Sequence, residues 1–473
     1  MIQLRDYQSE IAAALRHAYG MGHRAPLLVA PCGAGKTVLF SYIASQAASK
    51  GNGTLILVHR QELLSQTSRT LSRFEVEHGL IAPGAEVTGD LVQVASVQTL
   101  VRRLARLDWT PTLVVVDECH HTTADTGHGK VLAHFADAKV LGVTATPERL
   151  DGKGLGIRAG GFFDVLVEGP SVADLVGRGY LSRPVVYAPK AQLDLSGIRT
   201  LGGDYEKGAL AAAMDRPAIH GDAVKHYQQY CEGTPTIAFC VSVAHAEHVA
   251  EAFRQAGYQA ASIDGTLDDR TRRQRIEDLG AGKLHALTSC EIISEGTDVP
   301  VVGGALLLRP TQSLALSIQQ IGRALRPYPG KERAVIIDAV GNVLKHGHPL
   351  EDRQWSLDAK PRRQRKDERK VGDDTVKVCP ECSAVHEPGP ECPECGYRYP
   401  AKTRRIAQVD GVLTEIRPDD RRLQAKREQA RCRTLEELQE LGRARGYREG
   451  WAAAIWNHRQ ARQRGAGQRW RTA

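Results

Sequence analysis

Residues 31–37, Pro-Cys-Gly-Ala-Gly-Lys-Thr, have the types and spacing that suit the binding of phosphate groups. They follow the apolar run 27–30 and precede the apolar stretch 38–44, so we expect a strand, a loop and a helix in that order. Lys36 would hold the β and γ phosphates, and Thr37 would offer its hydroxyl to Mg²⁺. Backbone N–H groups at the helix N-terminus would converge on the phosphates from Gly33, Ala34 and Gly35. The segment predicts a site for ATP and Mg²⁺.

Two carboxylates follow a second apolar run. Residues 113–116 are Leu-Val-Val-Val and lead directly into Asp117, Glu118, Cys119 and His120. Open parallel sheets bind ligands at the carboxyl ends of their strands. Phosphoryl transfer would use Asp117 to hold Mg²⁺ and Glu118 to polarise the attacking water. By itself the tetrad fits an ordinary turn, but its place about 80 residues after the phosphate loop favours ATP hydrolysis.

Four cysteines form two close pairs near the C-terminus. Cys379 and Cys382 are separated by two residues, as are Cys392 and Cys395, and nine residues lie between the pairs. This spacing is typical of a closed structural Zn²⁺ site with four thiolates. The alternative is that the four cysteines form two disulfides, but disulfides do not persist in the reducing compartment that we expect for this protein. We expect His386, between the pairs, to face solvent.

The elements that position these residues are predicted from continuous runs of Val, Ile and Leu, which are typical of strands buried on both faces of parallel sheets. Their recurrence between helical stretches predicts two α/β domains. A break near residues 160–170 separates the two sets, and residues 171–230 contain irregular stretches that are rich in glycine and polar residues. Besides the run before the phosphate loop, the runs are 55–58, 113–116, 140–143, 236–239, 285–288, 305–308 and 334–337.

Positive charge is concentrated at the C-terminus. The chain of 473 residues has a net charge of +8, whereas residues 359–473 alone hold 27 Lys and Arg against 17 Asp and Glu. Because neutralising phosphates releases counterions, such an appendage suggests a polyanionic partner, although a solvated tail without a specific partner is an alternative. Candidate contacts in this tail are its last arginines, Arg459, Arg462, Arg464, Arg469 and Arg471.

The tail also has helical spacing. Residues 434–441 predict a helix that is capped by Thr434, and residues 451–456 begin a second one, so a hairpin that turns at Gly446 is expected. Trp456 and Trp470 could stack on bases, but aromatic residues at helical spacing are more often core, so packing is expected for Trp451 and Trp456. No run approaches the roughly 18 apolar residues that a membrane span needs, and the polar N-terminus is unlike a signal peptide, so we expect a cytoplasmic protein.

Several segments resemble the motifs of superfamily 2 helicases. Residues 4–8, Leu-Arg-Asp-Tyr-Gln, resemble the adenine-reading Q motif, which implies that Gln8 pairs with the base edge and that Arg5 or Tyr7 packs nearby. Residues 57–63 and 94–100 resemble the strand-contacting motifs. This likeness implies phosphate-backbone contacts for Arg60, Gln98 and Thr99.

The remaining motifs concern coupling and the second domain. Residues 142–147 resemble motif III, which implies that Thr144 and Thr146 couple hydrolysis to movement. Residues 294–300 are similar to motif V and 319–326 to motif VI, in which Gln319 would assist coupling. The resemblance further implies the nucleotide-binding pair Gly296 and Asp298 and the catalytic set His120, Arg323 and Arg326. The two arginines would reach the γ phosphate from the second domain as arginine fingers.

The resemblance implies an α/β fold of two tandem RecA-like domains with parallel sheets, a small zinc module with four cysteine ligands and a basic helical tail. The expected regions are a first RecA-like domain at 1–167, a second at 168–350, a basic linker at 359–377, the zinc module at 378–399 and the tail at 400–473.

Within the superfamily, the core resembles type III restriction motor subunits, and the trailing cysteine pairs resemble bacterial RadD-type repair helicases and phage-borne relatives. This implies a nucleic-acid motor, with DNA favoured over RNA, in repair, recombination or phage replication. Single-strand-binding or repair proteins are candidate partners, and a monomer is compatible with the sequence. The open alternatives are a duplex translocase of a restriction-like system, an RNA helicase, and a non-enzymatic zinc-dependent nucleic-acid-binding protein. The motifs do not separate unwinding from translocation.

Overall fold

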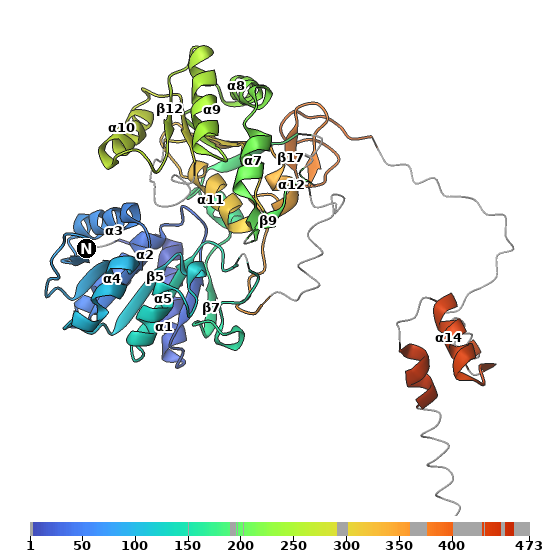
Figure 1. Cartoon of the computed structure of the whole chain (residues 1–473), viewed down its shortest axis with the longest axis horizontal. Helices are drawn as coiled ribbons and strands as arrows, with labels where there is room; N and C mark the ends of the chain where they lie inside the picture. Colours follow the sequence, from blue (N-terminus) through green and yellow to red (C-terminus); the bar gives the residue numbers. More distant parts are fainter. Residues whose placement is uncertain are drawn as a thin grey trace, which may run out of the picture. The chain divides into compact units, whose positions relative to one another are not determined.

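The computed structural model describes residues 3–149, 151–189, 195, 197–201, 203–290, 301–359, 376–400, 428–429, 431–445 and 450–457. It divides the chain into two compact units, residues 1–401 and 402–473 (Figure 1). Gly296 and Asp298 of the predicted motif V lie outside the described residues, as do Arg459 and Arg462.

A parallel sheet forms the first half of the larger unit. Its seven described strands have the order β3-β4-β2-β5-β6-β1-β7. All four predicted runs before residue 150 lie in these strands, within one residue at each end. In chain order the strands are β1 (Pro26–Val29), β2 (Thr54–Val58), β3 (Gly79–Ile81), β4 (Val92–Ser96), β5 (Leu113–Asp117), β6 (Lys139–Thr144) and β7 (Val165–Glu168).

Helices cover both faces of this first sheet because its strands are apolar on both sides. Leu28 and Ile56 pack with helices α1, α2 and α3 in one buried cluster. Leu27 and Leu55, the preceding residue of each strand, point to the opposite face and pack with α4 and α5. The helices are α1 (Asp6–Gly20), α2 (Lys36–Ala48), α3 (Gln61–Arg73), α4 (Val97–Arg103) and α5 (Gly127–His134).

The second sheet has eight described strands, in the order β12-β13-β11-β14-β15-β8-β17-β16. Six of them are parallel, and the predicted runs from residue 236 onward lie in them, again within one residue. The strands are β8 (Arg183–Tyr187), β11 (Thr236–Phe239), β12 (Ala260–Ile263), β13 (Ala286–Ser289), β14 (Gly304–Leu307), β15 (Arg333–Asp338), β16 (Lys377–Val378) and β17 (Ala384–His386). A separate pair is formed by β9 (Thr200–Leu201) and β10 (Asp204–Tyr205).

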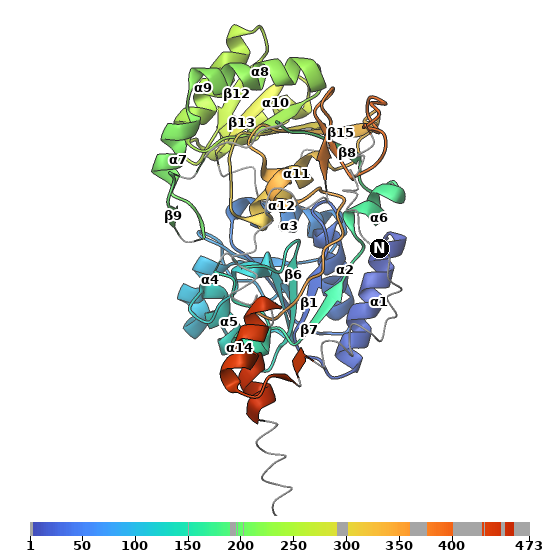
Figure 2. The ribbon, with the colours of Figure 1, turned by 90° about the vertical axis from the view of Figure 1, so that its right-hand side faces the viewer.

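The helices of the second half lie around this sheet, and α11 and α12 lie beside the first half (Figure 2). They are α6 (Val172–Gly177), α7 (Lys207–Met214), α8 (Pro217–Cys231), α9 (Val243–Gln255), α10 (Asp269–Gly280), α11 (Leu314–Ala324) and α12 (Asn342–His346). Residues 171–230, which are predicted to contain irregular stretches, also hold four regular elements, namely α6, β8, α7 and most of α8.

The segment with the predicted zinc ligands continues the second sheet. Its strand β17 pairs antiparallel with β8, and β16 pairs antiparallel with β17. We call residues 376–400 the four-cysteine segment. Because β17 of this four-cysteine segment pairs with β8, the segment covers the side of β8 that would otherwise be an open sheet edge.

The smaller unit contains α14 (Leu435–Ala444) and a helical segment at 451–457. The predicted cap is confirmed, because the Thr434 side chain accepts a hydrogen bond from the backbone N–H of Glu437. The packing predicted for Trp451 is confirmed as well, since a Cβ on Gly442 would lie 3.4 Å from its ring. Within the described residues, no helix has the length and apolar character that crossing a membrane requires.

Candidate ATP-hydrolysis site

The phosphate loop connects β1 to α2 and depends on two glycines. Gly33 and Gly35 have φ angles of 86° and 71°, in the left-handed region that side chains disfavour. Gly35 is the N-cap of α2, so the free backbone N–H groups of this helix start at the loop. Lys36 Nζ donates to the carbonyls of Ala30 and Pro31 at 3.2 and 3.3 Å. The loop thus holds its own lysine over the position that phosphate oxygens would take.

The N-terminus of α1 is fastened to this loop. Tyr7 donates from its hydroxyl to the carbonyl of Ala34 at 3.0 Å, and Gln8 donates from Nε2 to the same oxygen at 3.2 Å. Gln8 Oε1 accepts from the backbone N–H of Arg5, whose guanidinium lies 4.9 Å from the Tyr180 ring centre. Arg5 also lines the same cavity as Lys36. Both Q-motif residues therefore lie at the nucleotide loop, and base recognition by Gln8 stays a prediction.

The two carboxylates lie where β5 ends. Asp117 is buried, and Glu118 has a φ of 48°, a conformation that costs a non-glycine residue on the order of 1–3 kcal/mol. Burial, together with the nearby charge of Glu118, raises the pKa of Asp117 to about 7. A cation beside Asp117 would relieve both effects, and Thr37 lines the same cavity. This oxygen donor set fits Mg²⁺, which would neutralise charge on the phosphates when bound.

A buried network joins Glu118 to the end of β6. His120 Nδ1 lies 3.4 Å from Glu118 Oε2 and shares a hydrogen bond of 3.0 Å with Thr144 Oγ1. Thr144 Oγ1 in turn accepts from the backbone N–H of Thr146 at 3.1 Å. A change at Glu118 therefore has a direct path to the strand that follows it in the sheet. The coupling roles of the threonines stay predictions.

Helix α11 brings the second half of the unit to this site. Arg323 and Arg326 line one cavity of about 340 Å³ together with Lys36, Asp117 and Glu118. The backbones meet closely here, because a Cβ added to Gly322 would lie 2.4 Å from Cys32 Cβ. Gln319 lines a neighbouring cavity of about 750 Å³ with His120.

Sequence reasoning missed the residue that fixes the end of α11. Lys331 Nζ donates to the carbonyls of Val302, Ala324 and Arg326 at 2.6, 2.5 and 2.6 Å. A cation at the last carbonyls of a helix satisfies acceptors that lack partners within it. Burial and the charge of Arg326 lower the pKa of Lys331 to about 8. Its place after a turn gave no local signal of this role.

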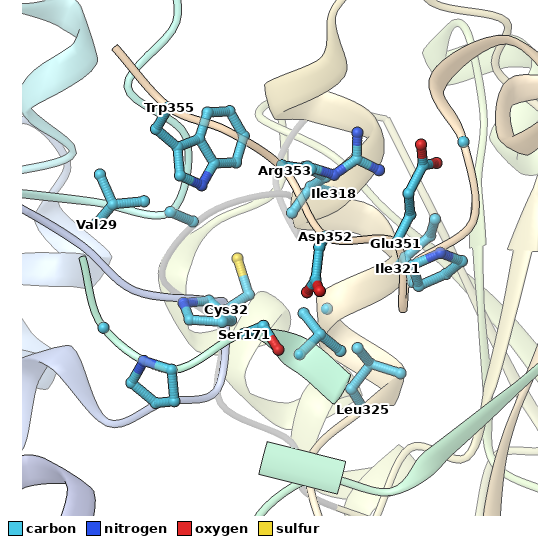
Figure 3. A pocket seen from close by; sticks show the side chains of 18 of the residues that line it. Val29, Cys32, Ser171, Ile318, Ile321, Leu325, Glu351, Asp352, Arg353 and Trp355 are labelled. Atoms are coloured by element: carbon cyan, nitrogen blue, oxygen red, sulfur yellow. The ribbon is translucent and has the colours of Figure 1, made fainter. Parts of the chain in front are cut away.

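A third cavity, of about 290 Å³, lies on the other side of Cys32, whose sulfur points into it (Figure 3). The chain after α12 borders it and crosses back toward the first sheet. Arg353 donates to the carbonyl of His346. Trp355 and Leu357 pack against the buried cluster of Leu27 and Leu55, on the face of the first sheet that α4 and α5 cover. This crossing segment connects the two halves in addition to the link that follows β7.

The predicted nucleic-acid contacts lie at the ends of two adjacent strands. Arg60 is the N-cap of α3, just after β2, and Gln98 and Thr99 are in the first turn of α4, just after β4. Gln98 Nε2 donates to the carbonyl of His59 at 3.1 Å. The structure brings the three residues to one edge of the sheet, and their contact with a nucleic acid stays a prediction.

The four cysteines come together as predicted. The sulfurs of Cys379 and Cys395 lie 3.6 Å apart, and those of Cys382 and Cys392 lie 3.7 Å apart. Thiolates around one tetrahedral Zn²⁺ would lie about 3.8 Å apart, so the spacing fits zinc and is far longer than a disulfide. Although burial opposes it, hydrogen bonds from the backbone N–H groups of Cys382 and Glu381 lower the pKa of Cys379 to about 7.

The prediction for His386 is wrong. The residue is buried, shares a hydrogen bond of 2.9 Å between Nε2 and the Tyr399 hydroxyl, and shares another between Nδ1 and the carbonyl of Glu387. His386 lies in β17, and the pairing of β17 with β8 directs its side chain inward. The local sequence does not reveal this pairing.

Fold and cavity together define a motor of two RecA-like domains that hydrolyses ATP between them. Two family models match the chain: "Type III restriction enzyme, res subunit" over residues 1–149 and "Helicase conserved C-terminal domain" over residues 222–328. The 51.5 kDa protein of a Lactococcus phage is 33% identical over 374 residues, which cover 79% of this chain and 78% of that protein. The chain therefore belongs to this family of superfamily 2 helicases with a core like that of restriction motors.

Two further similarities agree with this family. A Saccharomyces cerevisiae protein named as an ATP-dependent helicase, IRC3, is 31% identical over 361 residues, and the match covers 72% of this chain. The chain spans about half the length of that yeast relative. A fragment of an HsdR subunit of a type I restriction enzyme from Vibrio vulnificus matches with a TM-score of 0.57 and 21% identity over 73% of this chain and 66% of that one, which supports the fold.

Proposed function

We infer that this protein is an ATP-driven helicase or translocase that acts on DNA. The observation that carries this inference is the single cavity in which Lys36, Asp117 and Glu118 of the first domain meet Arg323 and Arg326 of the second. Charge on transferring phosphates is stabilised when all these groups are in place, so hydrolysis requires a closed cleft. Loss of the γ phosphate would remove what holds the domains together and allow them to reopen.

The roles follow from the contacts. Lys36 binds the β and γ phosphates after it leaves the carbonyls of Ala30 and Pro31. Glu118 orients the attacking water, and its backbone strain holds the carboxylate at the end of β5. Arg323 and Arg326 neutralise charge that develops on the γ phosphate, and Lys331 positions Arg326. His120 and Thr144 pass the change at Glu118 to β6.

DNA is the proposed track because the first family model is named for a subunit of a restriction enzyme, and a relative from Sulfurisphaera tokodaii is named as a DNA 3'-5' translocase. Repair, recombination or phage replication is the proposed setting, with single-strand-binding or repair proteins as partners. We also propose that the four-cysteine segment binds Zn²⁺ and that the protein works in a reducing compartment such as the cytoplasm, where thiolates persist.

The test is ATP turnover by the full chain, with zinc supplied, in the absence of nucleic acid and with single-stranded DNA, duplex DNA or RNA. We expect DNA to stimulate turnover at least tenfold and Lys36→Ala to abolish it. Glu118→Gln should bind ATP and DNA but not turn over. Stimulation by RNA alone would replace DNA as the track, and turnover retained by Lys36→Ala would remove the phosphate loop from the mechanism.

The basic tail can be tested without disturbing the motor. Residues 402–473 hold 18 Lys and Arg against 9 Asp and Glu, and the cut falls between the two compact units. Removing the tail should weaken DNA binding and flatten its dependence on salt, because fewer phosphates are neutralised. If the salt dependence of DNA affinity is unchanged after this removal, the tail does not contact DNA and the contacts lie in the two RecA-like domains. A cut at residue 359 would also remove β16 and β17 and is a poorer design.

A further inference from the structure

A second group of metal-binding side chains lies in the second domain, apart from the four-cysteine segment. Asp215 follows α7, His220 lies in the first turn of α8, and His248 lies in α9. One ligand atom from each residue lies within 4.8 Å of the other two. The corner between α7 and α8 therefore lies against α9.

The three side chains converge on one carboxylate oxygen. His220 Nε2 and His248 Nδ1 each lie 2.8 Å from Asp215 Oδ1. The contact with His248 is a hydrogen bond, whereas His220 Nε2 is buried with no hydrogen-bond partner among the described residues. His220 is 9% exposed, so water cannot easily satisfy this nitrogen. Its contact with Asp215 Oδ1 is short but lacks the geometry of a hydrogen bond.

We propose that Asp215, His220 and His248 bind a divalent transition-metal ion of the Zn²⁺, Co²⁺ or Ni²⁺ class. Two imidazole nitrogens and one carboxylate oxygen are the donors these ions prefer, and three protein ligands leave a position for water. The His248 side chain is 57% exposed, which gives the ion a route to the site. Ligand atoms on a tetrahedral Zn²⁺ lie about 3.3 Å apart, so each histidine must retreat by roughly 0.5 Å.

A fourth histidine supports this group without joining it. His245 is fully buried, and its ring centre lies 5.3 Å from that of His220, against which it packs. Its Nδ1 accepts from the backbone N–H of Val241, so the proton of the neutral ring stays on Nε2 and no lone pair is left for a metal.

The bound ion would join two parts of the second domain that the chain separates. Asp215 and His220 belong to the corner between α7 and α8, and His248 belongs to the helix that follows β11. The ion would replace the proton between His248 and Asp215 and complete the coordination of His220. The site does not contribute to the nucleotide cavity, so it is independent of the proposed motor function.

The test is a titration with Co²⁺ of the full chain that holds one equivalent of Zn²⁺, which the four thiolates bind first. The four-cysteine segment is then filled, and we expect one further equivalent per chain with weak visible d–d bands and no thiolate-to-metal charge-transfer band. His248→Ala should abolish this equivalent, and Asp215→Asn should weaken it at least tenfold. His134→Ala, which removes an exposed histidine of α5, is the matched control and should leave uptake unchanged.

Two results would overturn the proposal. Wild-type protein that takes up no further equivalent has no such site, and uptake that His248→Ala retains belongs elsewhere. A charge-transfer band from thiolates would assign the cobalt to the four cysteines and equally reject the site. Because His248 is largely exposed, circular dichroism of the variant should match that of the wild type, which separates lost ligation from lost folding.

Discussion

The two RecA-like domains share one topology and divide the chemistry between them. Strands β8, β11, β12, β13, β14 and β15 take the same places in the second sheet that β1 to β6 take in the first. In the first sheet, β1 leads into the phosphate loop and β5 ends at Asp117. In the second, β8 leads into Ala188 and Pro189, and β14 ends at Leu307. The fold alone therefore does not hydrolyse ATP; the loops at the strand ends determine which domain binds it.

The same comparison exposes a difference at the sheet edge. The place beside β1 is filled by β7, a parallel strand that continues the first domain. The matching place beside β8 is filled by β17, an antiparallel strand from the four-cysteine segment. Arg183 of β8 also pairs with Glu394 of that segment at 2.7 Å. The four-cysteine segment is thus a structural part of the motor and not only a C-terminal attachment.

The largest expected effect tests whether the second domain contributes catalysis. Arg323→Ala or Arg326→Ala should lower kcat for ATP by about 10³-fold, because an arginine at the γ phosphate stabilises charge that develops in the transition state. ATP binding, measured by fluorescence with a labelled analogue, should change much less. Arg273→Ala, on the surface of α10, is the control and should keep wild-type turnover. Turnover that survives both substitutions in the cleft would mean that the first domain works alone.

The next test concerns the sheet edge. The double variant Cys382→Ser with Cys395→Ser should lower the free energy of unfolding of the second domain by several kcal/mol, since metal binding is coupled to folding and β8 loses its neighbour. Amide hydrogen exchange should show faster exchange in β8 and unchanged exchange in β1. Cys432→Ser, outside the segment, is the control. Protection of β8 that persists would make the segment dispensable for the motor.

A third test concerns the contact between the domains. Gly322→Ala should lower kcat by about 10- to 100-fold, because its Cβ would collide with Cys32 Cβ and keep the cleft from closing. Alanine favours a helix interior more than glycine does, so α11 itself should not weaken. Cys32→Gly removes the opposing Cβ and should restore turnover in the double variant. If the double variant is as slow as Gly322→Ala, the clash is not the cause.

The sequence predicted what local patterns encode. Continuous apolar runs marked the parallel strands, and the phosphate loop and the Asp117–Glu118 pair marked the catalytic edge, because these features depend on neighbours in the chain. The pairing of β17 with β8, the contact of Gly322 with Cys32 and the cap by Lys331 join residues far apart. His386 was misplaced for the same reason, since its inward direction depends on a distant strand.

The smallest expected effect concerns Asp117, the buried carboxylate at the end of β5. The matching end of β14 has Leu307 in its place. Burial and Glu118 raise the pKa of Asp117 to about 7, above its ordinary value, so the fold favours the protonated form. Between about pH 4 and 7, Asp117 loses its proton in the unfolded chain but keeps it in the folded protein. The free energy of unfolding of the wild type therefore falls as pH rises through this range. Asp117→Asn keeps the acceptor for the backbone N–H of Glu118 but does not ionise. Without nucleotide, it should therefore melt a few degrees above the wild type at pH 8 and together with it near pH 4.

The control for this last prediction is Glu118→Gln, which removes the neighbouring charge but leaves Asp117 able to ionise. It should lower the pKa of Asp117 and recover only part of the stability at pH 8, because the cost of burial remains. Asp117→Asn should lose ATP hydrolysis completely, while Leu307→Asn at the matching end of β14 should only destabilise the second domain. A stability gain for Asp117→Asn without activity would show that the first domain keeps a costly carboxylate for its metal. If Asp117→Asn and the wild type have equal melting temperatures at every pH, burial does not disfavour the ionised form of Asp117. The ends of β5 and β14 would then differ only in the loops that follow them.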